Sequence, residues 1–306
     1  MGANKSGGCG LLVLVVVGAL LAVGYYKSKH DSSTAPPSGA DTGGGSGRYV
    51  ALGDSYTSAP RTGKQSGSPA GCARSDNNYP HLVSAKLKPA KFVDVSCSGA
   101  TTDDLSDTQS TRKGSNPPQF DSVTADTTLV TLGIGGNDVG FIALAQSCVT
   151  AHESASPCKD RLTAGGKDQL ADRISDTAKK VGTALDQIHK KAPKARVVVV
   201  GYPTVLPDGD GCWPVLPLGA GDVAYLRDAL GKLNDALSDQ AKSHDAGFAD
   251  TAEPSKGHDV CANSDVKWVE GVVPTSSAAA LHPNARGEAG MAGAVESVLG
   301  CRGGRS

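Results

Sequence analysis

Short apolar runs rich in β-branched residues alternate with amphipathic segments along most of this chain. Strands are predicted for residues 48–52, 91–97, 127–135, 195–203 and 246–251. These runs are continuously apolar, as in strands that are buried on both faces of a parallel sheet. Helices are predicted where apolar residues recur every three or four positions, from Leu170 to Ile188 and from Val223 to Leu237, and after His282. The alternation predicts an α/β fold, a three-layer α/β/α sandwich with an open parallel sheet.

The N-terminal region differs in composition from the rest of the chain. Residues 11–26, "LLVLVVVGALLAVGYY", form an uncharged apolar run without a good small-residue cleavage site after it. We therefore expect residues 1–30 to be an uncleaved signal-anchor, with a cleaved signal peptide as the alternative. Residues 31–47 are rich in Ser, Pro and Gly, which is typical of a flexible linker. The folded domain is predicted to cover residues 48–306.

Charge and cysteine usage narrow the class of protein. The net charge is −1 and both signs are interspersed, so no nucleic-acid partner is expected. Cys9 falls in the apolar run, and the domain holds the other seven: Cys72, Cys97, Cys148, Cys158, Cys212, Cys261 and Cys301. Their spacing does not fit a zinc site, so we expect no metal and instead disulfides formed in an oxidising compartment. Spacing alone leaves the pairing open, although Cys148 and Cys158 form a local pair, and we expect Cys301 to remain unpaired.

Polar turns follow the first three predicted strands. Ser55 comes directly after the first strand in "YVALGDSYTS", "SCSGAT" follows the second, and "GIGGNDVG" follows the third. Gly-Asp-Ser alone is also ordinary turn and helix-cap chemistry. Because ligands of open parallel sheets bind beyond the carboxyl ends of the strands, the three turns should converge on one site. This position makes Ser55 a candidate nucleophile.

A serine nucleophile needs a base and donors for the oxyanion. His282 is the candidate base; it precedes the last predicted helix in "ALHPNARG", where it could also be a solvated residue at the helix start. The backbone near Gly99 and the side-chain amide of Asn137 are candidate donors, although both turns could be purely structural. A dinucleotide loop is excluded because Asp138 stands where the third glycine would be.

In this order the four segments resemble the SGNH, or GDSL, hydrolase superfamily. They are Ser55 in "ALGDSYTS", Gly99 in "VSCSGATT", Asn137 in "LGIGGNDVGF" and His282 in "LHPNARG". The resemblance covers residues 48–300 and is closest to the secreted, disulfide-containing lipases and esterases of actinobacteria. It implies a flavodoxin-like fold, no cofactor, and acyl transfer through an acyl-enzyme on Ser55 with His282 as base. The oxyanion hole would consist of the backbone N–H groups of Ser55 and Gly99 and the amide of Asn137.

The same resemblance implies three disulfides. They pair Cys72 with Cys97, Cys148 with Cys158, and Cys212 with Cys261. This pairing leaves Cys301 over.

One position departs from the family pattern. The family usually has Asp three residues before the histidine, and this chain has Ala279 there. A backbone carbonyl can orient the imidazole instead, so we predict a Ser–His dyad with the carbonyl of Ala279 or Ala280 as the acceptor. Asp259 or Asp265, from the preceding loop, is the alternative.

Two apolar loops are candidates for substrate binding. Their residues could line an acyl groove or touch a lipid surface, or they could simply pack within loops that are held by cysteines. They are Trp213, Val215, Leu216, Leu218, Trp268 and Val269.

We predict a monomeric, exported lipase or esterase, which could include phospholipase activity. It would act on ester or lipid substrates outside the cell or at the outer face of the cytoplasmic membrane, which its N-terminal segment would bind if uncleaved. A carbohydrate or cell-wall O-acetyl esterase and an inactive SGNH-fold binding module are the alternatives.

Overall fold

The computed structural model describes residues 47–300, so the predicted signal segment, most of the linker and Cys301 lie outside the described residues. Its centre is a five-stranded parallel sheet in the order β2-β1-β5-β6-β7. The strands are β1 (Arg48–Gly53), β2 (Lys91–Asp94), β5 (Thr127–Gly133), β6 (Arg196–Val200) and β7 (Gly247–Ala249). Each predicted strand is therefore present, and the predicted fold class is confirmed.

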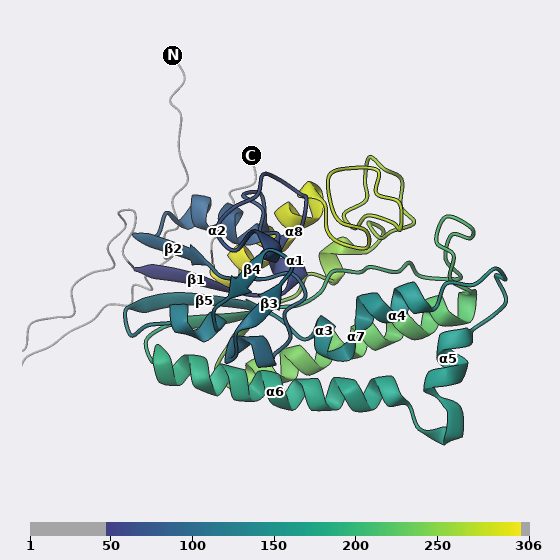
Figure 1. Cartoon of the computed structure of the whole chain (residues 1–306), viewed down its shortest axis with the longest axis horizontal. Helices are drawn as coiled ribbons and strands as arrows, with labels where there is room; N and C mark the ends of the chain where they lie inside the picture. Colours follow the sequence, from purple (N-terminus) through teal and green to yellow (C-terminus); the bar gives the residue numbers. More distant parts are fainter. Residues whose placement is uncertain (1–46, 301–306) are drawn as a thin grey trace, which may run out of the picture.

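Helices cover both faces of the sheet (Figure 1). On one face, α6 (Gln169–Lys191) and α7 (Ala220–Ser243) lie side by side. On the other face, α2 (Tyr79–Leu87) packs against α8 (Ala285–Val298). The side chain of Asn284 caps the N-terminus of α8 by accepting hydrogen bonds from two backbone N–H groups of its first turn. This cap sets where the last helix begins, directly after the His282 loop.

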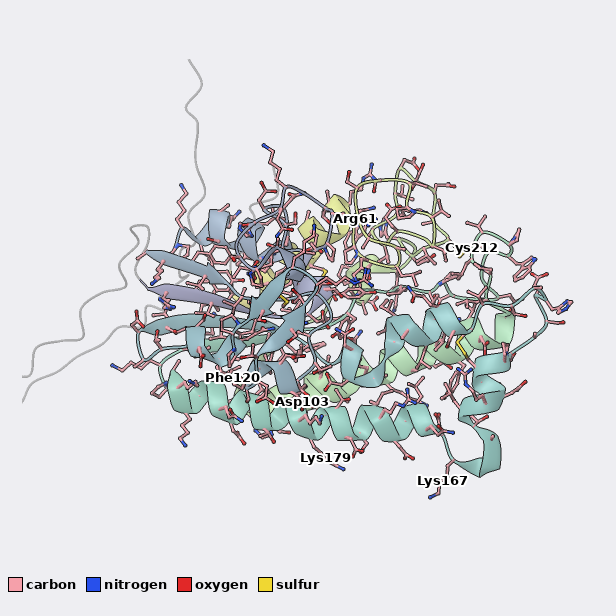
Figure 2. All side chains as sticks on the ribbon, in the orientation of Figure 1. Arg61, Asp103, Phe120, Lys167, Lys179 and Cys212 are labelled. Carbon is pink, nitrogen blue, oxygen red and sulfur yellow. A yellow bond between two sulfur atoms is a disulfide. The ribbon has the colours of Figure 1, made fainter. Side chains whose placement is uncertain are left out.

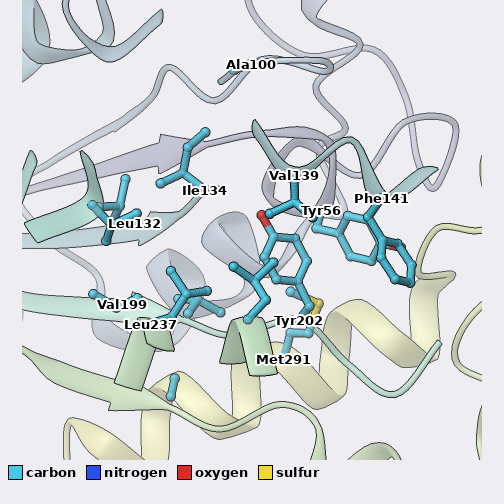
Figure 3. Packing of buried hydrophobic residues seen from close by; sticks show 14 of the residues in the cluster. Tyr56, Ala100, Leu132, Ile134, Val139, Phe141, Val199, Tyr202, Leu237 and Met291 are labelled. Atoms are coloured by element: carbon cyan, nitrogen blue, oxygen red, sulfur yellow. The ribbon is translucent and has the colours of Figure 1, made fainter. Parts of the chain in front are cut away.

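The core lies between the sheet and these helices. Figure 3 shows side chains of this core, including Leu132 and Val199 from neighbouring strands, Leu237 from α7 and Met291 from α8. All four are buried. Because the central strands are covered on both sides, their side chains are apolar at successive positions rather than at alternate ones. Burial of each Leu or Val contributes about 1.5–3 kcal/mol.

Several short elements were not predicted from the sequence. They are α1 (Ser55–Ser58), α3 (Gly136–Val139), α4 (Phe141–Ser147), α5 (Pro157–Leu162), the hairpin of β3 (Gln109–Thr111) and β4 (Gly114–Asn116), and 3₁₀ turns at Ala70–Cys72, Asp103–Leu105, Gln119–Ser122, Ala164–Gly166 and Glu253–Ser255. Elements this short contain too few residues to show a hydrophobic period. Among the described helices, none has the length and apolar character needed to cross a membrane.

Three disulfides hold the loops around the carboxyl edge of the sheet. Cys72 is bonded to Cys97, Cys148 to Cys158, and Cys212 to Cys261. These are the pairs that the family resemblance implies. The third disulfide joins the loop after β6 to the loop after β7, and Figure 2 shows Cys212 at the end of the molecule that also carries α4 and α5. Disulfides of this kind are typical of proteins in an oxidising compartment.

Candidate active site

Ser55 is the first residue of α1, immediately beyond the carboxyl end of β1. The Asp54 side chain caps this short helix, because its Oδ1 accepts a hydrogen bond from the Tyr56 N–H at 2.8 Å. Gly53 precedes it with φ = +155°, and a Cβ at this position would lie 2.2 Å from Thr57 Oγ1. Glycine therefore allows the chain to turn sharply from strand to helix, which presents Ser55 at the edge of the sheet.

His282 meets Ser55 across this edge. Its Nε2 lies 2.8 Å from Ser55 Oγ, and its Nδ1 lies 2.8 Å from the carbonyl oxygen of Ala280. A carbonyl oxygen can only accept, so Nδ1 carries the hydrogen and the unprotonated Nε2 accepts the Ser55 hydroxyl hydrogen. Both side chains are buried. This is the arrangement of a serine nucleophile, its base and a third group that orients the base.

The residues proposed to orient His282 occupy different places. The Ala279 carbonyl accepts the backbone N–H of His282 at 3.2 Å, whereas the Ala280 carbonyl faces the ring. The Asp259 carboxylate accepts the Cys261 N–H at 2.8 Å, and Asp265 is exposed. Of the four, only Ala280 is bonded to the imidazole. Burial lowers the pKa of His282, and the hydrogen bond to Ala280 partly opposes that shift.

Glu270 supports the loop that carries His282 and was not singled out from the sequence. Its N–H donates to the His282 carbonyl at 3.0 Å. Its buried carboxylate accepts hydrogen bonds from Asn284 Nδ2, Ser276 Oγ and the Thr275 N–H at 2.8, 2.6 and 2.6 Å. Burial alone would raise the pKa of Glu270, but these bonds outweigh it and lower the pKa to about 2. The carboxylate is therefore charged and holds both sides of the His282 loop together.

Two tyrosines connect the segments of the site. The Tyr56 hydroxyl donates to the Leu281 carbonyl at 2.7 Å, beside His282. The Tyr202 hydroxyl donates to Asp54 Oδ2 at 2.6 Å and accepts the Gly136 N–H at 2.7 Å. The rings of Tyr56 and Tyr202 meet edge to face with centroids 5.1 Å apart, and Figure 3 shows them close together.

Burial raises the pKa of Asp54 to about 7 even though its hydrogen bonds to Tyr202 and Tyr56 oppose the shift. A tyrosine next to a strand end has the same sequence pattern as a core residue, so neither role could be read in advance.

The loops that carry Gly99 and Asn137 are bonded to each other. Asn137 Nδ2 donates one hydrogen to the Ala100 carbonyl at 2.8 Å. The Asp138 carboxylate accepts the Thr102 N–H at 3.0 Å. Gly99 itself has φ = +83°, a conformation that favours glycine, and is exposed. The two turns after β2 and β5 are therefore joined to each other, and Asn137 lines a depression with Ser55.

Hydrogen-bond donors remain free at Ser55 and in the turns that carry Gly99 and Asn137. Among the described residues, no acceptor is bonded to the backbone N–H of Ser55 or of Gly99. Asn137 keeps a second amide hydrogen, and it lines a small depression together with Ser55 and Phe141. Groups of this kind can stabilise a developing oxyanion.

An apolar cavity of about 210 Å³ adjoins the depression. Its wall is formed by Phe141, Ala145, Gln146, Val149, Val205, Leu206, Leu216, Pro217, Leu218, Val272, Ala280 and Leu281. Phe141 lines both spaces, and Ala280 and Leu281 of the cavity wall directly precede His282, so the cavity lies beside the site of Ser55. Two of the six candidate acyl-binding residues, Leu216 and Leu218, are in this wall.

The two tryptophans are not in the cavity wall. The ring of Trp268 stacks on His258 with centroids 4.9 Å apart and covers Gly290 of α8. Trp213 is partly exposed in the loop that carries Leu216 and Leu218. The stacking on His258 and the contact with α8 account for the position of Trp268, which lies outside the apolar cavity.

One cluster of potential metal ligands occurs in the described part of the chain, and it does not fit a metal. It consists of Cys148, Cys158 and Asp222. Both sulfurs are in a disulfide, and the Asp222 carboxylate accepts the N–H groups of Cys158 and Lys159. The cluster is therefore explained by ordinary loop packing.

Comparison with known proteins decides the family. Residues 51–289 match the model of the GDSL-like lipase/acylhydrolase family. The chain belongs to this family. Its members are carboxylic ester hydrolases, so the enzyme class and the family predicted from the sequence are confirmed.

Individual relatives of this GDSL-like enzyme are lipases and esterases. It is 39% identical to Lipase 2 of Streptomyces coelicolor, with 82% of this chain and 85% of the relative covered. Its structure is similar to that of phospholipase A1 from Streptomyces albidoflavus NA297, with a TM-score of 0.69, 31% identity and coverage of 83% and 98%. The extracellular lipase from Streptomyces rimosus is also similar, with a TM-score of 0.64, 28% identity and coverage of 82% and 99%.

Proposed function

We propose that this enzyme is an exported lipase or phospholipase that hydrolyses fatty-acyl esters through a Ser55–His282 dyad. The proposal is carried by the 2.8 Å hydrogen bond between Ser55 and His282 beside an apolar cavity. Relatives named lipase and phospholipase A1 support a lipid ester as substrate. The disulfides and the predicted N-terminal signal segment support export, with attachment to the outer face of the membrane if that segment is uncleaved.

The first half of the reaction acylates Ser55. His282 Nε2 takes the hydroxyl proton while Oγ attacks the ester carbonyl carbon. The oxyanion that forms accepts hydrogen bonds from the N–H groups of Ser55 and Gly99 and from the amide of Asn137. The ester C–O bond then breaks, His282 returns the proton to the leaving alcohol, and the acyl group remains on Ser55.

The second half releases the fatty acid. His282 takes a proton from water, which attacks the acyl-enzyme through the same oxyanion hole, and Ser55 Oγ recovers the proton as it leaves. The Ala280 carbonyl keeps the imidazole in the required tautomer throughout. A carbonyl dipole stabilises the transient imidazolium less than a carboxylate would, because it carries no net charge.

The acid limb of the pH profile should report His282. Below its pKa, His282 is protonated and cannot accept the Ser55 proton, so activity falls as the pH is lowered through that value. Because burial lowers this pKa, the acid limb of kcat/KM should have its midpoint below the ordinary histidine value of about 6.5. The measurement is kcat/KM for an uncharged short-chain p-nitrophenyl ester between pH 4 and 9. This range extends roughly two pH units on each side of the ordinary histidine pKa. A midpoint above 7 would contradict a buried base without a carboxylate partner.

Chain-length preference tests the role of the cavity. Activity on p-nitrophenyl esters is expected to increase from acetate to octanoate, because each buried methylene contributes about 0.8 kcal/mol. Ala145→Phe places a ring in the cavity and should lower kcat/KM for octanoate about tenfold, the equivalent of about two methylenes, with acetate nearly unchanged. Turnover confined to acetate in the parent would instead favour a carbohydrate or cell-wall O-acetyl esterase.

A matched control lies on the same helix. Ala143 is exposed on α4 and is not in the cavity wall, so Ala143→Phe should leave the ratio of octanoate to acetate rates unchanged. Equal effects of the two variants would show that the cavity does not bind the acyl chain.

A further inference from the structure

Exposed valines gather around the mouth of the apolar cavity. Among the described residues, the exposed large hydrophobic side chains are Val149, Val215, Val266, Val272 and Val273. Val149 and Val272 are in the cavity wall, while Val215 and Val273 are next in sequence to wall residues. Val215 and Val273 are the most exposed, at 71% and 80%. We call Val149, Val215, Val272 and Val273 the valine rim.

The segments that carry the valine rim lack charged residues. Residues 139–152, 211–221 and 271–281 contain no Asp, Glu, Lys or Arg, although 20% of the chain is charged. The first two are joined by a hydrogen bond from the Thr150 N–H to the Pro217 carbonyl at 3.0 Å. Charged side chains are common elsewhere, for example along α6, where Lys179 projects away from the loop of Cys212 (Figure 2). These three segments supply ten of the twelve residues of the cavity wall.

We propose that the valine rim docks the enzyme onto an uncharged or zwitterionic lipid surface, so that an acyl chain enters the cavity without crossing water. The proposal rests on the proposed lipid-ester activity and assigns its docking surface. A protein-binding patch is typically enriched in aromatic residues and Arg, whereas this rim has aliphatic side chains of equal length around a pocket for one chain. Without basic residues, the rim offers nothing to attract anionic headgroups, so docking should depend on apolar contact alone.

The chain before β1 is long enough to let the valine rim face a membrane that holds the apolar run. Residues 27–47 connect β1 to the apolar run and can span at most about 70 Å. A domain of this size is roughly 45 Å across. A membrane-bound apolar run would therefore still allow the carboxyl edge of the sheet, with the valine rim, to face the same lipid surface.

Binding can be tested without turnover. Residues 47–306 with Ser55→Ala, which contain the described fold but not the apolar run, are mixed with phosphatidylcholine vesicles and sedimented, alone and with Val215→Asp/Val273→Asp. The double substitution should weaken binding at least about tenfold, because each new carboxylate must be dehydrated at the surface. Adding phosphatidylglycerol or changing the salt concentration should have little effect on the parent. Equal binding of the two proteins, or binding that requires the anionic lipid, would overturn the proposal.

Hydrolysis gives a second readout. In the enzyme with Ser55 intact, Val215→Asp/Val273→Asp should lower hydrolysis of phosphatidylcholine in vesicles about tenfold and leave a soluble butyrate ester within about twofold. The control Val266→Asp replaces an exposed valine outside the rim and should affect neither rate. Loss on both substrates, or on neither, would overturn the rim as a docking surface. Absence of all ester turnover in the parent would instead refute the proposed function, and the sedimentation result would still stand.

Trp213 provides a local probe of the docked face. It is one of two tryptophans in the chain and lies two residues before Val215. Its emission should shift to shorter wavelength on phosphatidylcholine vesicles, and Trp213→Phe should remove the shift. If the rim instead joined two copies of this chain, the double substitution would convert a dimer to a monomer with vesicle binding unchanged, and the proposal would fail.

Discussion

Replacing Ser55 with alanine is expected to lower kcat for a short-chain ester by at least about a thousandfold while the fold is retained. Ser55 Oγ lies 2.8 Å from His282 Nε2, and the backbone N–H of Ser55 has no acceptor among the described residues. Without Ser55 Oγ no acyl-enzyme forms, and the oxyanion hole alone leaves only a small residual rate. The measurement is kcat by burst-corrected initial rates, with thermal unfolding as the check on folding.

The same short helix contains a matched control. Ser58 is buried in α1, and its hydroxyl has no hydrogen-bond partner among the described residues. Ser58→Ala should therefore retain nearly full activity.

A different outcome would favour the inactive SGNH-fold binding module over the hydrolase. In that outcome the parent shows no turnover on any ester but still binds one, and Ser55→Ala binds that ester equally well.

Replacing His282 with alanine should cause a loss similar to that for Ser55→Ala, and the double variant should be no less active than either single variant. The reason is that nucleophile and base act as a unit, so removal of the second partner costs nothing further. His258 is the matched control, because its ring stacks on Trp268 and its Nδ1 is bonded to the Val266 carbonyl, away from Ser55. His258→Ala should change kcat by less than about threefold, as expected for a residue outside the reacting unit.

Additive losses in the double variant would contradict the dyad. They would mean that His282 stabilises the fold or the substrate rather than activating Ser55. A single variant that retained a tenth of the activity would lead to the same conclusion, since general-base catalysis contributes about 10²–10⁴-fold.

Much of the architecture followed from local patterns. The strands were predictable because a parallel sheet covered on both faces requires continuous apolar runs, and α6 and α7 because each has one apolar side over many turns. Placement of Ser55, Gly99 and Asn137 at one edge followed from the parallel topology alone. Short elements such as α4 could not be predicted, since they are held by packing against longer helices and loops.

The details of the candidate site depended on contacts between distant segments. Glu270 supports His282 through hydrogen bonds that exist only after the loop has folded back onto α8. Tyr56 and Tyr202 bridge segments that are far apart in sequence. Such residues carry no local signal, because their roles come from partners that are distant in the sequence.

The sequence by itself determined the parallel α/β sheet, the ester-hydrolase family and the choice of Ser55 and His282 as candidates for nucleophile and base, because each depends on residue type and order. Only the tertiary structure decided that Ala280 rather than Ala279 or an aspartate faces His282, that Leu216 and Leu218 line the cavity while Trp268 stacks on His258, and that separate uncharged segments meet around one opening. These outcomes depend on the path of loops after the strands, and a loop's path is set by long-range disulfides, caps and packing rather than by its own residues.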